Sequence, residues 1–140
     1  MGGGGAIAAA ALVEAGHQAT VIAPVGNGVE GDAIVRATSA LGVKTDHVIR
    51  VPQLGVATLL LIEPNGERVV LSLGDKRRPQ QQTAVIQQQL SESITRALGR
   101  QKFDGVFLRA HWPGITELFE DTAAPILSPA PTEVAVGADY

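Results

Sequence analysis

The sequence contains no cysteine among its 140 residues. A disulfide framework, a thiol nucleophile and a zinc site built on cysteine are therefore all excluded. Excess charge of either sign is also lacking, because 11 Lys and Arg against 14 Asp and Glu leave a formal net charge of −3. A balance of this size gives no electrostatic argument for binding nucleic acid or an anionic membrane. We therefore expect neither partner.

Long hydrophobic runs are scarce as well. The longest one near the N-terminus, Ala6–Val13, has eight residues and no basic leader before it. It is too short to span a bilayer and does not resemble a signal peptide. With 45% hydrophobic and 18% charged residues, the composition is that of a globular chain. The sequence thus predicts one soluble, cytoplasmic domain.

The most informative feature that is present is a run of glycines leading directly into an alanine-rich helical pattern, GGGGAIAAAALVEAG at 2–16. Glycine permits backbone angles and close approaches that a side chain would forbid. A small ligand therefore has room against bare main chain at the start of the helix, where free N–H groups point outward. By itself the same run also fits a flexible terminus, so both interpretations stay open here.

Hydrophobic periodicity predicts an α/β chain with parallel strands. Helices are expected at 5–15, 30–41, 80–98 and 114–120, and strands at 20–25, 47–51, 57–62, 67–72, 105–109 and 125–128. Asn65-Gly66 is the strongest hairpin signal, because both residues tolerate a positive φ. The two strands beside it are expected to form a flap that stands away from the core.

Apolar stripes give the expected faces of the helices. The first helix places Ile7, Ala11 and Ala15 in line, and the second aligns Ile34, Thr38 and Leu41 before a C-cap at Gly42. The third helix carries a longer stripe of Ile86, Leu90, Ile94 and Leu98.

The spacing of five glycines carries a resemblance to a known family. Gly2, Gly3, Gly5, Gly16 and Gly26 fall in register with the first signature of the ribokinase family, the pfkB-type sugar and nucleoside kinases. Further segments resemble that family in the same order along nearly the whole chain: VGNGVEG at 25–31, LGVKTDHV at 41–48, the lid-like GVATLLLIEPNGERVVLSLGD at 55–75, FDGVFLRAHWP at 103–113 and ILSPAP at 126–131.

The resemblance implies a partial ribokinase-like fold, a Rossmann-like parallel sheet with helices and a small β lid at about 47–74. A single incomplete kinase domain would span 1–140. The implied activity is transfer of the γ-phosphate of ATP, with Mg²⁺, to a hydroxyl of a sugar or nucleoside. The family also implies a homodimer formed through the lid.

The resemblance also implies which residues line the substrate site. Gly3, Gly4 and Gly5 would approach the sugar by main chain, Thr58 and Leu60 would line the pocket from the lid, and His111 would close one side.

Four of the sugar-facing positions differ from the family pattern, among them His111, where many members carry glutamate, and Ser128, where asparagine is usual. Ile7 stands where the family carries asparagine and offers a hydroxyl no hydrogen bond. Asn27-Gly28 replaces a pair of acidic residues. These changes indicate relaxed selection or a less polar ligand. His111 is also explained by a strand-end histidine that packs against its neighbour.

No catalytic residue or metal ligand is assigned. The three histidines are scattered and have no convincing carboxylate partner. Gly137-Ala138-Asp139 echoes the family's catalytic GAGD motif, but only Tyr140 follows, so no helix can supply an anion hole. The first strand and the nucleotide-binding half of the family are also expected to be missing. We therefore expect no catalysis, and no dependable ATP binding, by this chain alone. A non-catalytic dimerisation or protein-binding module, or a truncated product without a selected role, remains an alternative.

Overall fold

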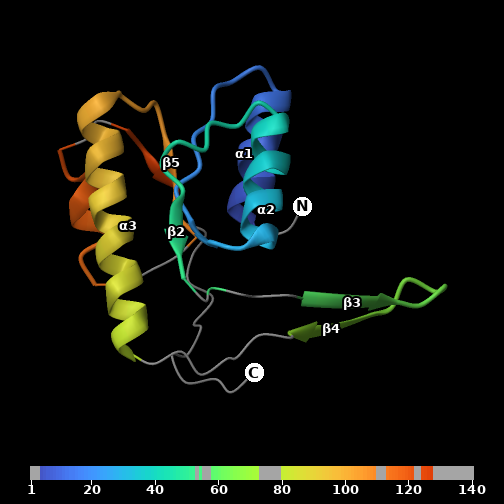
Figure 1. Ribbon diagram of the computed structural model, residues 1–140. Coiled ribbons are helices and arrows are strands. Elements are labelled where there is room, and N and C mark those ends of the chain that lie inside the picture. Colours follow the sequence, from blue (N-terminus) through green and yellow to red (C-terminus); the bar gives the residue numbers. More distant parts are fainter. Residues whose placement is uncertain are drawn as a thin grey trace.

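Three helices surround short strands in the computed structural model, which describes residues 4–52, 54, 58–72, 80–109, 113–121 and 124–127 (Figure 1). Helices α1 (Gly4–Glu14) and α2 (Val29–Ala40) lie on one side, and α3 (Gln80–Arg100) lies on the other. Strand β1 (Pro24–Gly26) contacts α2, and β2 (Ile49–Val51) contacts α3. The predicted α/β class, as a partial ribokinase-like fold, is confirmed.

Strands β1 and β2 pair in parallel, with Val25 opposite Arg50. An isolated parallel bridge joins Thr20 to Lys44 further upstream. Between these two pairings, the segment that leads into β2 has one residue more than the segment that leads into β1. A turn takes up this residue, and in it the Val48 N–H donates to the Thr45 carbonyl at 3.0 Å. This turn is why regular pairing is shorter than the predicted strands at 20–25 and 47–51.

A second parallel pair is formed by β5 (Val106–Phe107) and β6 (Ile126–Leu127). Both strands were predicted from the sequence, but each is shorter than expected. Between them, the helix predicted at 114–120 is a short 3₁₀ turn, η1 (Thr116–Phe119). Within the described residues, the two parallel pairs are separate and do not form one continuous sheet.

Helix α3 supplies the largest apolar stripe of the core. The predicted positions Ile86, Leu90 and Ile94 are buried, because each side chain faces the strands. Ile94 packs with residues of β5 and η1, whereas Ile86 and Leu90 pack with Val51 of β2. Burial of each such side chain contributes roughly 1.5–3 kcal/mol. This stripe therefore anchors α3 to both parallel pairs.

Helix α1 uses a different face from the one that its sequence suggested. Ala9 is its buried residue and packs against Ala19 and Val43, whereas Ile7 is 55% exposed. Because the helix is apolar nearly all the way round, its sequence has no strong periodicity that selects one face. The small Ala9 side chain faces inward because the neighbouring segments approach closely there.

Helix α2 partly follows its predicted stripe. Thr38 is buried and its hydroxyl donates to the Ile34 carbonyl at 2.8 Å. Ile34 and Leu41, however, are exposed. Gly42 ends the helix at a φ of +80°, as predicted, and a Cβ added there would lie 3.0 Å from Val13 Cγ1, so the end of α2 lies close to α1.

The hairpin of β3 (Thr58–Ile62) and β4 (Arg68–Ser72) projects away from the three helices (Figure 1). The hairpin itself was predicted, but its turn differs. The Gly66 N–H donates to the Glu63 carbonyl at 2.9 Å, which places Pro64 and Asn65 at the centre of the turn. Proline fixes a negative φ, so Gly66 takes the left-handed position after the turn, with a φ of +88°.

Candidate functional site

The carboxyl ends of β1 and β2 lie on the side of the body that faces the β3–β4 hairpin, as do the first turns of α1 and α2 (Figure 1). In open α/β sheets, ligands bind outside the carboxyl ends of the parallel strands. We call this side the carboxyl edge and define it by Gly4, the loop Gly26–Gly28, Arg50, Leu54 and Arg109.

Glycine is required at two positions of the carboxyl edge. A Cβ added to Gly31 would clash with the Gly26 carbonyl oxygen, and one added to Gly26 would lie 2.5 Å from the Leu54 carbonyl oxygen. The end of β1, the start of α2 and the segment after β2 are therefore in direct backbone contact. Only Asn27 and Gly28 separate β1 from α2, and both are exposed.

Arg50 ties the same parts together with its side chain. Its Nη1 donates to the Gly26 carbonyl at 3.1 Å, and its Nη2 lies 2.9 Å from Asp32 Oδ1. Among the described residues this is the single ion pair. Asp32 also belongs to the first turn of α2, where a negative charge favours the positive end of the helix dipole.

Arg109, which follows β5, brings the end of that strand close to the N-terminal end of α1. A Cβ added to Gly4 would lie 2.8 Å from Arg109 Nε and 3.2 Å from Nη2, so the guanidinium crosses over bare main chain. Arg109 is exposed, which leaves its donors accessible from the edge. The glycine run and the segment at 103–113, both singled out from the sequence, are thus brought together here.

Arg50, Asp32 and Arg109 were missed from the sequence. The sequence did offer a signal for Arg109, because it is a charged residue that directly follows the apolar strand segment and precedes His111. For Arg50 and Asp32 the sequence carried no signal, because 17 residues lie between the two partners of the ion pair. Only the parallel pairing of β1 with β2 brings Arg50 beside α2.

The predicted site residues are distributed unevenly in the structure. Gly4 and Gly5 begin α1, and no atom of the described residues lies within 4 Å of a Cβ added to Gly5, so these residues do not require glycine there. Ile7 is exposed on the same helix. Thr58 and Leu60 belong to β3 of the hairpin. Gly3 and His111 lie outside the described residues, and the substrate contacts of all these residues stay predictions.

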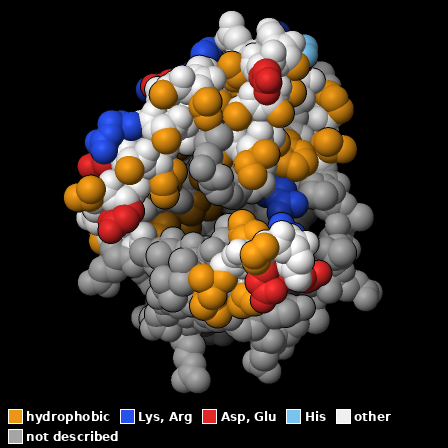
Figure 2. Space-filling view, turned by 90° about the vertical axis from the view of Figure 1, so that its right-hand side faces the viewer, with side chains coloured by type: hydrophobic (Ala, Val, Ile, Leu, Met, Phe, Trp, Pro, Cys, Tyr) orange, Lys and Arg blue, Asp and Glu red, His pale blue; other side chains and the backbone are white. Residues whose placement is uncertain are grey.

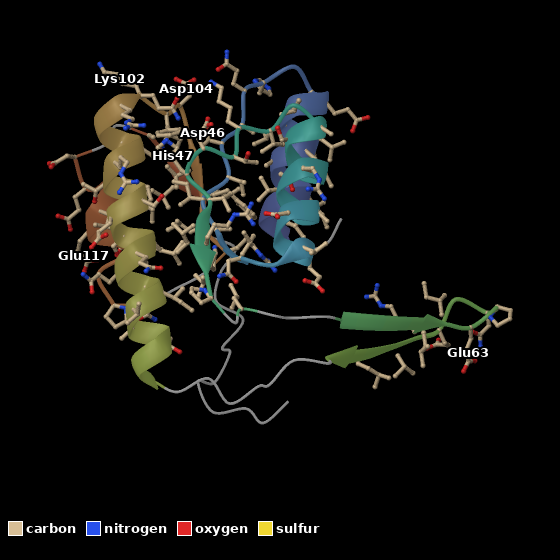
Figure 3. All side chains as sticks on the ribbon, in the orientation of Figure 1. Asp46, His47, Glu63, Lys102, Asp104 and Glu117 are labelled. Atoms are coloured by element: carbon tan, nitrogen blue, oxygen red, sulfur yellow. The ribbon has the colours of Figure 1, made fainter. Side chains whose placement is uncertain are left out.

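Figure 2 shows a hollow between the helical body and the β3–β4 hairpin, with basic side chains at its rim and hydrophobic side chains behind it. The labelled titratable residues Asp46, His47, Lys102 and Asp104 lie at the opposite end of the body, and Glu63 lies near the hairpin tip (Figure 3). The basic side chains at the rim of the hollow therefore do not belong to the group of labelled residues at the opposite end of the body.

Among the described residues, one titratable group has a displaced pKa, and it lies away from the carboxyl edge. The pKa of Glu117 falls below its ordinary value of 4.5, first because of the hydrogen bond with its own backbone N–H and second because of the Thr116 hydroxyl. That hydroxyl lies 3.0 Å from Glu117 Oε2. Both interactions favour the charged carboxylate, and neither involves the candidate site.

The family model described as pfkB family carbohydrate kinase matches residues 1–120. The chain belongs to the pfkB family of carbohydrate kinases. The match runs from the glycine run through η1 and includes the carboxyl edge and the hairpin. The resemblance drawn from the glycine spacing is thereby confirmed. A search of curated proteins found no significant match.

The pfkB kinases generally use ATP with Mg²⁺. Within the part of the chain that the structure describes, no three His, Asp or Glu side chains gather in a way that could hold a metal ion. The described residues therefore offer no cluster of side-chain ligands for the Mg²⁺ that accompanies ATP. None of the described helices has both the length and the apolar character needed to cross a membrane.

Proposed function

We propose that the chain binds a sugar or nucleoside at the carboxyl edge, in the place where pfkB kinases hold the acceptor of the γ-phosphate of ATP. The observation that carries this proposal is the close backbone contact among Gly26, Gly31 and Leu54, which holds the exposed residues Asn27 and Gly28 in place at the end of β1. Main-chain N–H and C=O groups at such an edge can pair with the hydroxyls of a sugar.

Side chains at the edge add a small set of polar groups. The exposed amide of Asn27 can both donate to and accept from a hydroxyl, and Arg109 adds donors at the mouth of α1. Ile7, which replaces the family's asparagine, is exposed and offers no hydrogen bond. The ligand is therefore held by Asn27, Arg109 and main chain, with fewer side-chain hydrogen bonds than the family pattern provides.

We further propose that the 140-residue chain does not transfer phosphate by itself. Transfer to a hydroxyl needs a base for the leaving proton and donors that stabilise the phosphoryl charge. At the junction of β1 and α2 the chain offers Asn27 and Gly28, and neither can accept a proton as a carboxylate does. Loss of a general base lowers the rate by roughly 10²–10⁴-fold.

Isothermal titration of the pure chain with D-ribose, D-fructose and adenosine tests binding. We expect a saturable heat with at least one of them, and a weaker one for Asn27→Ala. Asn65→Ala is the matched control, because it changes the other asparagine of the chain at the hairpin tip. Absence of binding by the unaltered chain would refute the binding proposal. Acceptor-dependent formation of ADP from MgATP would refute the proposed lack of catalysis.

A second candidate function rests on the hairpin. Leu61 pairs directly with Val69, and Leu71 lies two residues along the same strand, so the three side chains share one face. All are exposed, with Leu61 at 50% and Val69 at 52%. An exposed apolar strand face needs cover, because it otherwise promotes aggregation. We propose that a second copy of the chain covers this face in a homodimer.

Light scattering during size-exclusion chromatography tests the dimer. We expect the unaltered chain to elute as a dimer and the double variant Leu61→Ser, Val69→Ser to elute as a monomer. Ile62→Ser is the matched control, because Ile62 is 70% exposed but lies on the opposite face of the hairpin. A monomer at high concentration of the unaltered chain would exclude the dimer.

A further inference from the structure

The guanidinium of Arg50 bridges two segments that flank the loop Gly26–Gly28. One nitrogen donates to the Gly26 carbonyl at 3.1 Å, at the end of β1, and the other lies 2.9 Å from Asp32 Oδ1 in the first turn of α2. Arg50 itself is the central residue of β2. A side chain of the neighbouring strand thus fixes both the beginning and the end of the loop.

The main chain of the same loop is constrained from two further directions. Gly31 lies directly against the Gly26 carbonyl, and the Asp32 N–H donates to the Gly28 carbonyl at 3.0 Å. Between these fixed points stands Asn27, which is exposed. The orientation of Asn27 therefore depends on where its two anchors are held.

The exposure of the ion pair indicates what it contributes. The Arg50 and Asp32 side chains are 38% and 51% exposed, and an ion pair this accessible to water adds little to the free energy of folding. The planar guanidinium of Arg50 restricts the geometry of the loop, however, because its two terminal nitrogens contact two different segments at once. Its principal effect is on the shape of the loop and not on stability.

We propose that Arg50 and Asp32 are positioning residues that hold the loop Gly26–Gly28 in the shape that receives the sugar or nucleoside. They act through Asn27 and the loop main chain and do not touch the ligand. This inference rests on the proposed function of the carboxyl edge. It adds that affinity for the ligand depends on an ion pair formed behind the binding surface.

The test compares variants by titration with D-ribose, D-fructose and adenosine, together with thermal unfolding. We expect Arg50→Met and Asp32→Asn to weaken binding by about tenfold, with a nearly unchanged melting temperature. Arg50→Lys should restore part of the affinity, because an ammonium keeps the charge but not the fork. Unaltered affinity in Arg50→Met would overturn the proposal, as would a loss of affinity that merely follows a fall in melting temperature.

Two controls match the chemical changes. Arg36→Met removes an exposed arginine from α2, and Glu30→Gln removes a charge from the same first turn as Asp32. Both are expected to bind the same ligands as the unaltered chain does. If either control weakens binding as much as its counterpart, a general effect of charge explains the result and the proposal is wrong.

Amide hydrogen exchange keeps the inference testable if the unaltered chain binds none of the three probes, an outcome that refutes the proposed function of the edge. Arg50→Met should then raise exchange by about tenfold between Gly26 and Asp32, with α3 unchanged and Arg36→Met without effect. Unchanged exchange in this segment would refute the positioning role independently of any ligand.

Discussion

The helical body and the β3–β4 hairpin use similar aliphatic side chains in opposite ways. In the body, Ile94 is 5% exposed and packs with Leu108, Ile115 and Phe119. In the hairpin, Ile62 is 70% exposed although its strand is regularly paired. The body is therefore held together by side-chain burial, whereas the described part of the hairpin is held mainly by backbone pairing and its turn. Apolar character alone does not determine which region a residue stabilises.

The largest expected effect comes from truncating the same residue type in both regions. Ile94→Ala should lower the free energy of unfolding by about 2–5 kcal/mol, because it leaves a cavity among buried side chains. Ile62→Ala should change it by less than about 0.5 kcal/mol, because the side chain is already in water. Urea unfolding measures both. Equal losses of unfolding free energy would show that the Ile62 side chain is buried in solution, and the contrast between body and hairpin would then be wrong.

A smaller effect is expected when glycines are replaced in the two regions. Gly31→Ala should cost about 1–3 kcal/mol, because the new methyl group meets the Gly26 carbonyl. Gly66→Ala meets no atom of the described residues within 4 Å and should cost about 1–2 kcal/mol through its positive φ.

Gly99→Ala serves as the control for both glycine changes. It lies in α3, and no described residue has an atom within 4 Å of an added Cβ, so alanine should be tolerated or stabilising by up to about 1 kcal/mol. Thermal unfolding distinguishes the three variants. If Gly31→Ala proved as harmless as Gly99→Ala, the backbone contact at the carboxyl edge would not exist in solution.

The smallest effect concerns the pKa of Glu117, an exposed carboxylate in the helical body. Thr116→Val should raise the pKa of Glu117 toward its ordinary value of 4.5, but only partly, because the backbone hydrogen bond remains. A carboxylate whose pKa is lowered by folding stabilises the fold above its unfolded pKa, and this contribution disappears as pH falls through the folded pKa. The affected window therefore lies below about pH 4.5.

Titration followed by NMR measures the pKa of Glu117 directly. Thr95→Val is the control, because the Thr95 hydroxyl bonds to the Ser91 carbonyl in α3 and should leave Glu117 unaffected. A pKa of Glu117 that is the same in Thr116→Val and in the unaltered chain would mean that the hydroxyl does not contribute.

Periodicity predicted the elements better than it predicted their faces. The stripe of α3 was correct because large aliphatic residues alternate there with glutamine and serine, so one face is clearly apolar. The predicted stripe of α1 was not the buried one, because alanine on every side gives no contrast from which to choose. The turn at Asn65-Gly66 was located correctly, and Gly66 has a positive φ, but Pro64 and Asn65 occupy the centre of the turn because proline fixes a negative φ there.

The candidate site was only partly predictable. The glycine run and the turn at 25–31 stand out in the sequence, because local spacing is enough to identify them. Arg50 and Asp32 do not stand out, since each is an ordinary surface residue until the fold places them 2.9 Å apart. Contacts between residues distant in the chain depend on strand register, which composition and spacing do not encode.

The sequence by itself determined the family, the α/β order of elements and the helix ends at Gly16 and Gly42, because each depends on residues close together in the chain. Only the tertiary structure decided that Ala9 faces inward, that Arg109 crosses the mouth of α1 and that Arg50 anchors the loop after β1. These outcomes depend on which surfaces meet when the sheet and helices assemble. Local propensity is shared by many arrangements, and close packing selects one of them.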